Sequence, residues 1–152
     1  MIDIIKLKIY LDTSVISALF DERTPERLAL TKVAWERLVD CDVFISETVL
    51  DELKNTSPLL RDKMLAVVSD FTILPISNSA KNLAGLYIEQ GIFPAKYLDD
   101  ALHVALASTN QISILLSWNF THLVKIKTRR MVGLINSAQN YIPVEIISPP
   151  EL

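Results

Sequence analysis

Cysteine and glycine are both scarce in this sequence, and each shortage excludes a class of protein. The chain of 152 residues has one cysteine, Cys41, so it can form no internal disulfide, which fits a reducing cytoplasm, the location that we predict. Its three glycines do not form the glycine-rich loop that cradles phosphates, which argues against ATP binding by that route. Because half of the residues are hydrophobic, the composition indicates a folded chain, and the length predicts a single domain over residues 1–152.

A long apolar run, a secretion signal and an excess of positive charge are also missing. No uninterrupted apolar stretch approaches the length of a membrane span, and residues 1–6 lack the layout of a signal peptide, so we expect no membrane partner. The formal net charge is −3. A nucleic-acid ligand would therefore have to bind a local basic patch, since the chain as a whole is not a polycation.

Strand-like and helix-like patterns alternate along the whole chain. Strands are predicted over residues 7–11, 42–45, 71–74, 113–116 and 144–147, the first central in a sheet and the last at its edge. Helices are predicted over residues 15–20, 26–39, 46–54, 58–68, 77–90, 96–107 and 128–139. We expect Thr13 or Ser14 to cap the first helix. This alternation predicts a three-layer α/β/α domain with a mostly parallel sheet of four to five strands.

Several acidic and amide side chains follow the predicted strands. Asp12 comes directly after the first strand and Asn119 directly after the fourth, while Glu52 and Asp100 lie on neighbouring helices. Ligands of open parallel sheets bind outside the carboxyl ends of the strands, so we expect these four residues to share one rim. Glu52 borders the apolar face of its helix, whereas Asp51 points further away.

The helix around residues 96–107 has an unusual composition. It is apolar almost all round, which is typical of a buried helix, yet Asp99, Asp100 and His103 share one stripe on it. Buried carboxylates are costly unless something compensates them. In one interpretation the acids favour the helix N-terminus, with Asp99 pairing His103 one turn on. In the other, a cation binds them.

Three carboxylates at one point repel each other strongly unless a divalent cation holds them. Ligands that are all oxygen suit Mg²⁺ or Mn²⁺ better than Zn²⁺. A site of carboxylates and water matches chemistry on phosphates, in which the metal activates water and stabilises the leaving oxygen.

A basic cluster follows closely behind Asn119 in the sequence. Its members are Lys125, Lys127, Arg129 and Arg130. Such a cluster is either a solvated helix face or a clamp for nucleic-acid phosphates. Between the acids and this cluster, Trp118 and Phe120 are expected to pack in the core.

Four segments, in order, resemble the motifs of PIN domains. They are residues 9–14 (IYLDTS), 49–53 (VLDEL), 99–105 (DDALHVA) and 116–120 (LSWNF), and the likeness covers nearly the whole chain. The nearest likeness is to bacterial and archaeal PIN proteins of the VapC toxin type. It implies a Mg²⁺- or Mn²⁺-dependent endoribonuclease, often dimeric and often held inactive by a cognate antitoxin.

The resemblance also implies roles for particular residues. Asp12 and Asp100 would bind metal, and Glu52 would be the third acid. PIN domains commonly have a fourth acid where this chain has Asn119. An amide oxygen can still ligate or orient water, but the site has one negative charge fewer. Either the metal is held more weakly, or Asp99 makes up the charge.

We therefore predict an RNA-cleaving toxin that acts with a cognate antitoxin, binds RNA and forms a homodimer. The catalytic residues would be Asp12, Glu52, Asp100 and Asn119, and the metal ligands Asp12, Glu52, Asp99 and Asp100. Substrate would bind to Thr13, Ser14, Lys125, Lys127, Arg129 and Arg130.

Other functions fit the same residues to different degrees. The main alternative is a catalytically weak or inactive PIN-like module that binds RNA or a partner. A phosphoacceptor receiver domain is disfavoured because the third strand is followed by residues 75–78, which include no acid. A haloacid-dehalogenase-like phosphatase needs a second aspartate where Ser14 stands.

Overall fold

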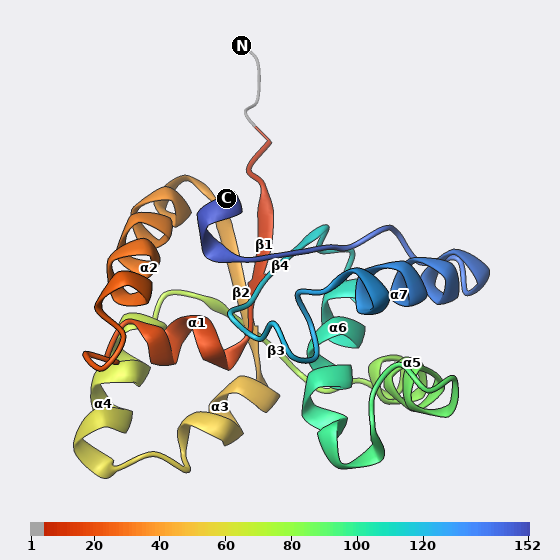
Figure 1. Cartoon of the computed structure of the whole chain (residues 1–152), viewed down its shortest axis with the longest axis horizontal. Coiled ribbons are helices and arrows are strands. Elements are labelled where there is room, and N and C mark those ends of the chain that lie inside the picture. The colour runs from red at the N-terminus through yellow and green to blue at the C-terminus, as the bar shows by residue number, and fades with distance from the viewer. Residues whose placement is uncertain (1–4) are drawn as a thin grey trace.

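Five short strands form one parallel sheet in the computed structural model, which describes residues 5–152 (Figure 1). The strands are β1 (Lys8–Leu11), β2 (Asp42–Ser46), β3 (Thr72–Leu74), β4 (Ile114–Leu116) and β5 (Glu145–Ile147). Their order in the sheet is β3-β2-β1-β4-β5, and every neighbouring pair is parallel. This confirms the predicted sheet, with the first strand at the centre and the last at an edge. The prediction about the N-terminal segment falls partly on residues 1–4, which lie outside the described residues.

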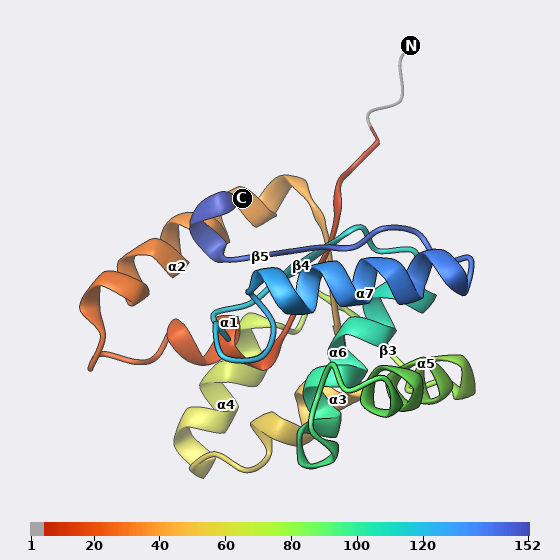
Figure 2. The same ribbon diagram turned by 45° about the vertical axis from the view of Figure 1, so that its right-hand side comes forward.

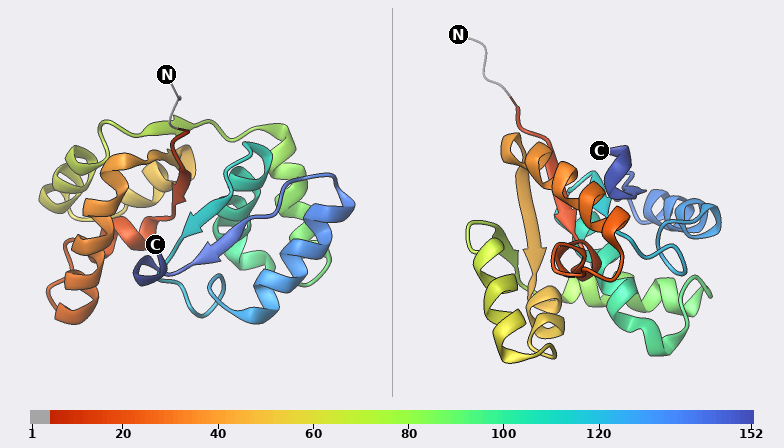
Figure 3. Two further views of the ribbon diagram at one scale, coloured as in Figure 1. Left: turned by 90° about the horizontal axis from the view of Figure 1, so that it is seen from above. Right: turned by 60° about the vertical axis from the view of Figure 1, so that its left-hand side comes forward.

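Helices cover both faces of this sheet. They are α1 (Thr13–Ala18), α2 (Pro25–Arg37), α3 (Glu47–Leu53), α4 (Pro58–Val67), α5 (Asn78–Glu89), α6 (Leu98–Thr109) and α7 (Ile126–Ala138). Three single turns of 3₁₀ helix are also present, at Leu38–Asp40, Ala95–Tyr97 and Pro149–Glu151. Helices α1, α2 and α4 lie on one side of the sheet, and α5, α6 and α7 on the other (Figures 1 and 3). The architecture is therefore the predicted three-layer α/β/α sandwich.

The carboxyl ends of the strands meet at one edge of the sheet, and α3 lies there. This short helix contacts both α1 and α6, so it joins the two helical layers below the sheet. Ser46 caps it by accepting a hydrogen bond from the backbone N–H of Val49 at 3.3 Å. The cap directs α3 across this edge, so residues on α1, α3 and α6 face one another.

The core is built around β1 and α6. Ile9, Tyr10 and Leu11 of β1 are fully buried, and every residue of α6 from 101 to 108 is buried too. Within residues 5–152 no helix combines the length and apolar character needed to cross a membrane. The continuous apolar surface of α6 is thus explained by its position between the sheet and α5, as its composition predicted.

Helix α2 leaves large apolar residues exposed and buries a polar one. Leu30 and Val33 remain 43% and 44% exposed, whereas Thr31 and Ala34 on the same helix are buried. The Thr31 hydroxyl donates to the carbonyl of Arg27 at 2.6 Å, which satisfies a polar group in the interior. The apolar residues of this helix therefore belong only partly to the core.

Candidate active site

Asp12 lies at the carboxyl end of β1 and caps α1. Its Oδ1 accepts hydrogen bonds from the backbone N–H of Ser14 at 3.1 Å and from the Ser14 hydroxyl at 2.5 Å, and its Oδ2 accepts from the Ser117 hydroxyl at 2.5 Å. The expected cap by Thr13 or Ser14 is wrong, because α1 begins at Thr13 and leaves Asp12 in the N-cap position. The side chain is held on three sides, so its orientation is fixed before any ligand binds.

The carboxyl group of Asp12 carries an electrostatic cost. Asp12 is only 3% exposed. Burial raises its pKa above the ordinary range, and the charge of Glu52 raises it further, while His103 and the two serine hydroxyls oppose this. A buried acid with a raised pKa is one whose charged form gains from a nearby cation.

Glu52 points inward from α3, as its position on the helix predicted. Its Oε1 accepts a hydrogen bond from Thr13 Oγ1 at 2.9 Å and lies 2.7 Å from His103 Nε2. Burial raises the pKa of Glu52, but the hydrogen bond and charge of His103 outweigh it, so the net pKa is lowered. Asp51, by contrast, is exposed and pairs loosely with Lys54.

His103 connects this acid to a buried chain of polar groups. Its Nδ1 lies 2.7 Å from the hydroxyl of Tyr10, which itself lies 2.7 Å from Ser46 Oγ. His103 is 2% exposed, and burial lowers its pKa, but Glu52 reverses this and the net pKa is raised. The expected pairing of His103 with Asp99 is therefore replaced by pairing with Glu52, because α3 packs against this face of α6.

Asp100 and Asn119 face each other across the rim. Asn119 Nδ2 donates to Asp100 Oδ1 at 3.4 Å, and Asn119 Oδ1 accepts from the backbone N–H of His122 at 2.9 Å. Burial raises the pKa of Asp100, and the charges of Asp12 and Glu52 add to the shift. The charge of Asp12, at the end of β1, therefore reaches Asp100 on α6.

Asp99 occupies a different part of the rim. It is exposed. Its pKa is raised by partial burial first and then by the charges of Glu52 and Asp51. Asp99 thus lies within reach of the charges on α3, whereas Asp100 contacts Asn119.

The four acids predicted as metal ligands do not gather at one point among the described residues. Within residues 5–152, no three Asp, Glu, His or Cys side chains converge closely enough to ligate one ion. The reason is that Glu52 is held by His103 and Thr13, while Asp99 faces α3. The oxygens of Asp12 and Asp100, whose pKa values are raised chiefly by burial, are of the kind that a divalent ion prefers.

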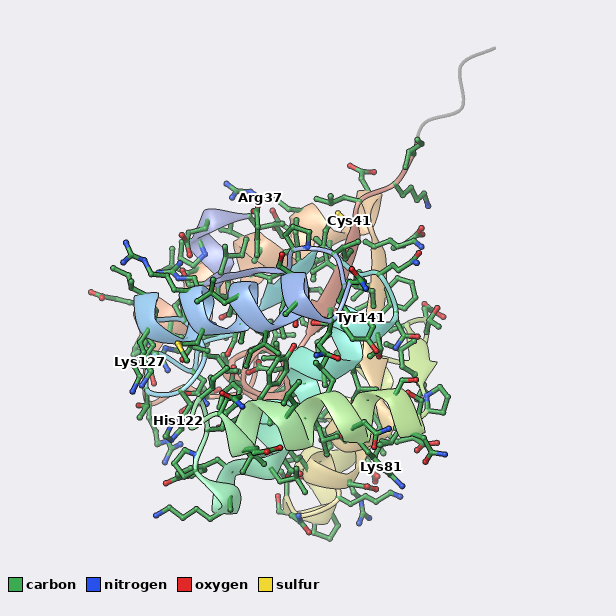
Figure 4. The ribbon with its side chains drawn as sticks, turned by 90° about the vertical axis from the view of Figure 1, so that its right-hand side faces the viewer. Arg37, Cys41, Lys81, His122, Lys127 and Tyr141 are labelled. Atoms are coloured by element: carbon green, nitrogen blue, oxygen red, sulfur yellow. The ribbon has the colours of Figure 1, made fainter. Side chains whose placement is uncertain are left out.

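The residues predicted to bind substrate differ in whether their side chains already form hydrogen bonds. The hydroxyls of Thr13 and Ser14 donate to Glu52 and Asp12, so they position the acids. Arg129 Nη1 donates to the carbonyl of Ile146 at 3.4 Å. Lys127 and Arg130 are exposed, and Figure 4 shows Lys127 near the start of α7, on the same side of the molecule as His122.

The aromatic pair in the loop before α7 divides between core and surface. Trp118 is buried, as expected, and its Nε1 donates to Thr31 Oγ1 at 2.9 Å. Phe120 is 48% exposed, so its predicted core position is wrong. Its ring lies edge-on to Trp118 with centroids 6.1 Å apart, because the loop turns outward after Asn119.

Three residues of the site were not singled out from the sequence. Tyr10 and Ser46 belong to the buried hydrogen-bonded chain, and Ser117 binds both Asp12 and the backbone N–H of Asn119. Their positions in the sequence could have identified them. Polar side chains at buried positions of β1 and β2, or immediately after β4, need hydrogen-bond partners in the interior.

Known protein structures share this fold, although no protein-family model and no curated protein matches the sequence. A chain of Mycobacterium tuberculosis VapC20, described as a sarcin–ricin loop cleaving toxin, is 15% identical, with a TM-score of 0.60 over 90% of this chain and 98% of that one. A chain of VapBC-1 from nontypeable Haemophilus influenzae is 12% identical, with a TM-score of 0.60 over 94% and 98%. A chain of Rickettsia felis VapBC2, bound to promoter DNA, is 14% identical, with a TM-score of 0.58 over 93% and 98%.

These likenesses define the fold. The chain has the PIN-like α/β/α fold that occurs in these VapC and VapBC structures, and the match spans nearly the full length of both partners. The resemblance of the four sequence motifs to PIN domains is thereby confirmed at the level of the fold.

Proposed function

We propose that the chain is a divalent-metal-dependent endoribonuclease that hydrolyses RNA phosphodiesters, and that it is the toxin of a toxin–antitoxin pair. The observation that supports this best is the pair of aspartates, Asp12 and Asp100, at the carboxyl rim of the sheet. Each has a pKa raised by burial, and each carboxylate faces the charges of other acids. VapC20, which has the same fold, is described as a sarcin–ricin loop cleaving toxin.

Asp12 and Asp100 would hold the ion, which we propose is Mg²⁺ or Mn²⁺. When bound, it supplies positive charge that activates water and stabilises the leaving 3′-oxygen. Ser14 and Ser117 fix the Asp12 carboxylate, so little reorganisation is needed. Attack of water on the phosphorus and departure of the 3′-oxygen would leave a 5′-phosphate and a 3′-hydroxyl.

Glu52 has a separate role in this proposal. Thr13 and His103 hold its Oε1, and its lowered pKa keeps it ionised at neutral pH. While His103 is neutral, this fixed negative charge at the rim favours cation binding without direct ligation. Asp99, which faces the same helix, adds to this potential.

The first test is metal binding measured by calorimetry. Asp12→Asn and Asp100→Asn should each abolish Mn²⁺ binding, because each removes an anionic oxygen from the ion. Asparagine is as good an N-cap as aspartate, so Asp12→Asn should leave α1 intact. In the metal-free protein both variants should melt at a higher temperature at pH 7, since each removes a charge that burial disfavours. Unchanged Mn²⁺ binding in both variants would contradict the proposed site.

A catalytically weak or inactive binding module is the second candidate. Asn119 favours it, because its Oδ1 already accepts from His122 and its Nδ2 faces Asp100. An amide in this orientation offers the ion a donor hydrogen where an acid would offer an oxygen. Purified protein that binds Mn²⁺ and RNA but leaves the RNA intact would support this function.

The proposal also includes protein partners. Leu30 and Val33 on α2 and Leu59 on α4 are large apolar residues that remain exposed. We propose that the exposed apolar residues of α2 and α4 contact a cognate antitoxin or a second copy of the chain, in the cytoplasm. Light scattering with and without the product of a neighbouring small gene would measure both associations.

A further inference from the structure

A second cleft opens beside the acidic rim, and residues of the active site form one of its walls. It has a volume of about 310 Å³ and is lined by Ser14, Ser17, Asp21, Arg27, Trp118 and Asn119. Ser14 also holds Asp12, and Asn119 also contacts Asp100. The loop of residues 117–125 passes α1 here, as Figure 2 shows, and Trp118 N donates to Ser14 Oγ at 2.9 Å. A ligand in this cleft would therefore lie next to the proposed metal site.

Arg27 is the charged group that distinguishes this cleft. Its guanidinium carbon lies 4.8 Å from the centroid of the Trp118 ring, a cation–π contact. Trp118 is fixed in turn by its bond to Thr31, whose hydroxyl donates to the backbone of Arg27 itself. Among residues 5–152 the Arg27 side chain donates no hydrogen bond and has no carboxylate within salt-bridge distance. Its planar set of donors is thus pre-positioned and available for a ligand.

The one acid in the lining is already neutralised. Asp21 accepts hydrogen bonds from Arg23 Nε at 2.9 Å and from Arg23 Nη2 at 3.1 Å, and these bonds lower its pKa. The lining holds one arginine and one aspartate, and because Arg23 pairs with that aspartate from outside the lining, the charge of Arg27 is left to attract an anion. The cleft lies beside a rim that contains Asp12, Glu52 and Asp100, so a positive patch adjoins a negative one.

This combination fits a phosphate of a polynucleotide better than it fits other ligands. A guanidinium binds phosphate oxygens through two parallel hydrogen bonds. An RNA strand that brings one phosphate to the acids must hold its neighbouring phosphates away from them, on positive charge. The Ser17 hydroxyl lines the same cleft and is a suitable donor to a sugar or phosphate oxygen.

We propose that this cleft is a phosphate subsite for the RNA strand, in which Arg27 binds a backbone phosphate next to the one that is cleaved. The proposal rests on the ribonuclease function proposed above. It adds α2 to the substrate path, whereas the basic cluster on α7 lies on the other side of the sheet.

The test compares RNA binding by three variants, with Ca²⁺ in place of Mg²⁺ to suppress cleavage. Arg27→Gln should weaken binding of a short single-stranded RNA about tenfold and lower the slope of log K against log salt by roughly 0.7, the value for one neutralised phosphate. Arg27→Lys should keep the slope and recover part of the affinity, because it restores the charge without the planar donors. Lys32→Gln is the matched control, since Lys32 is exposed on the same helix and points about 140° away from Arg27.

Neutral methylphosphonate linkages identify the phosphate. We expect that placing the neutral linkage at one position next to the cleaved one lowers the RNA affinity of the parent protein. The same RNA should bind Arg27→Gln as well as unmodified RNA does, because the variant no longer binds that phosphate. Mn²⁺ affinity measured without RNA should be the same in the parent and all three variants.

Two different failures are distinguishable. If Arg27→Gln binds RNA with the affinity and salt slope of the parent while Asp100→Asn still abolishes cleavage, the subsite is wrong and the ribonuclease function stands. If the parent neither binds nor cleaves RNA, the proposed function fails and the subsite with it. A loss of RNA affinity in Lys32→Gln equal to that in Arg27→Gln would also overturn the subsite, since it would show a general charge effect.

Discussion

His103 shows how one buried side chain joins several elements at the site. It lies on α6, pairs with Glu52 on α3 and contacts Tyr10 on β1. The tyrosine hydroxyl can donate to neutral His103 or accept from the charged form, while Ser46 supplies the complementary group. Both charge states of His103 therefore keep their hydrogen bonds in the interior.

The pH dependence of stability follows from the directions of two pKa shifts. Glu52 has a pKa below its ordinary value of 4.5. Its contribution to the free energy of unfolding is therefore present above that pH and is lost as pH falls through the folded pKa. His103 has a pKa above its ordinary value of 6.5, so its contribution is complete below that pH and is lost as pH rises through the folded pKa. The pair therefore stabilises the fold most between about pH 4.5 and 6.5.

Replacing His103 tests this window. In urea titrations of metal-free protein, His103→Gln should lower the free energy of unfolding by about 1–3 kcal/mol at pH 5.5, the usual cost of unpairing a buried polar group. The difference from the parent should shrink as pH rises toward 9. Asn136→Ala is the control, because it removes buried hydrogen bonds to Tyr87 and Ser108 without removing a group that titrates in this range. A His103→Gln difference that stays as flat with pH as that of the control would contradict the ion pair.

Asn119 decides how much negative charge the proposed metal site holds. Asn119→Asp replaces the amide that donates to Asp100 with a second carboxylate. The variant should bind Mn²⁺ more tightly and should be less stable without metal, because the two carboxylates repel each other. Calorimetry and thermal melting measure the two effects. If Asp99 already supplies the missing charge, the gain in affinity should be absent in the parent background and appear only with Asp99→Asn.

At the level of secondary structure, α7 presents the second basic surface of the molecule. Arg129 and Arg130 lie in its first turns, behind the loop that holds Asn119. Replacing both with glutamine should weaken single-stranded RNA binding and lower the salt slope by roughly 0.7 for each phosphate that the protein no longer binds. Mn²⁺ affinity should not change. If the RNA affinity of the double variant and its salt slope match those of the parent in Ca²⁺ buffer, the cluster is a solvated helix face.

The elements were predictable from local patterns, and their ends were less so. Alternating apolar periods predicted all five strands and seven helices of residues 5–152, but α7 begins at Ile126 where residue 128 was expected. A shift of two residues at the start of α1 is the reason that Asp12 became the cap. Helix ends depend on which polar side chain reaches the free backbone N–H groups, and here three adjacent residues could do so.

At the level of the whole molecule, the predictable part of the site was its location. Parallel strands place their carboxyl ends at one edge, so Asp12 and Asn119 had to lie on the same rim. The partner of His103 was not predictable, because Asp99 one turn away and Glu52 on another helix were both acids within plausible reach. Only the packing of α3 against α6 decides between them. The cleft at Arg27 likewise depends on how the loop after β4 packs against α1 and α2.

The central claim is that Asp12 and Asp100 form the metal-dependent centre of a ribonuclease. The most direct measurement is cleavage of a 5′-labelled single-stranded RNA by the purified protein, with Mn²⁺, with EDTA, and in the Asp100→Asn variant. Cleavage should require Mn²⁺, should leave 5′-phosphate and 3′-hydroxyl ends, and should fall by at least about 100-fold in the variant, as expected for loss of a group that holds the reacting centre. Products with 2′,3′-cyclic phosphate ends, cleavage that persists in EDTA, or full activity of Asp100→Asn would contradict it.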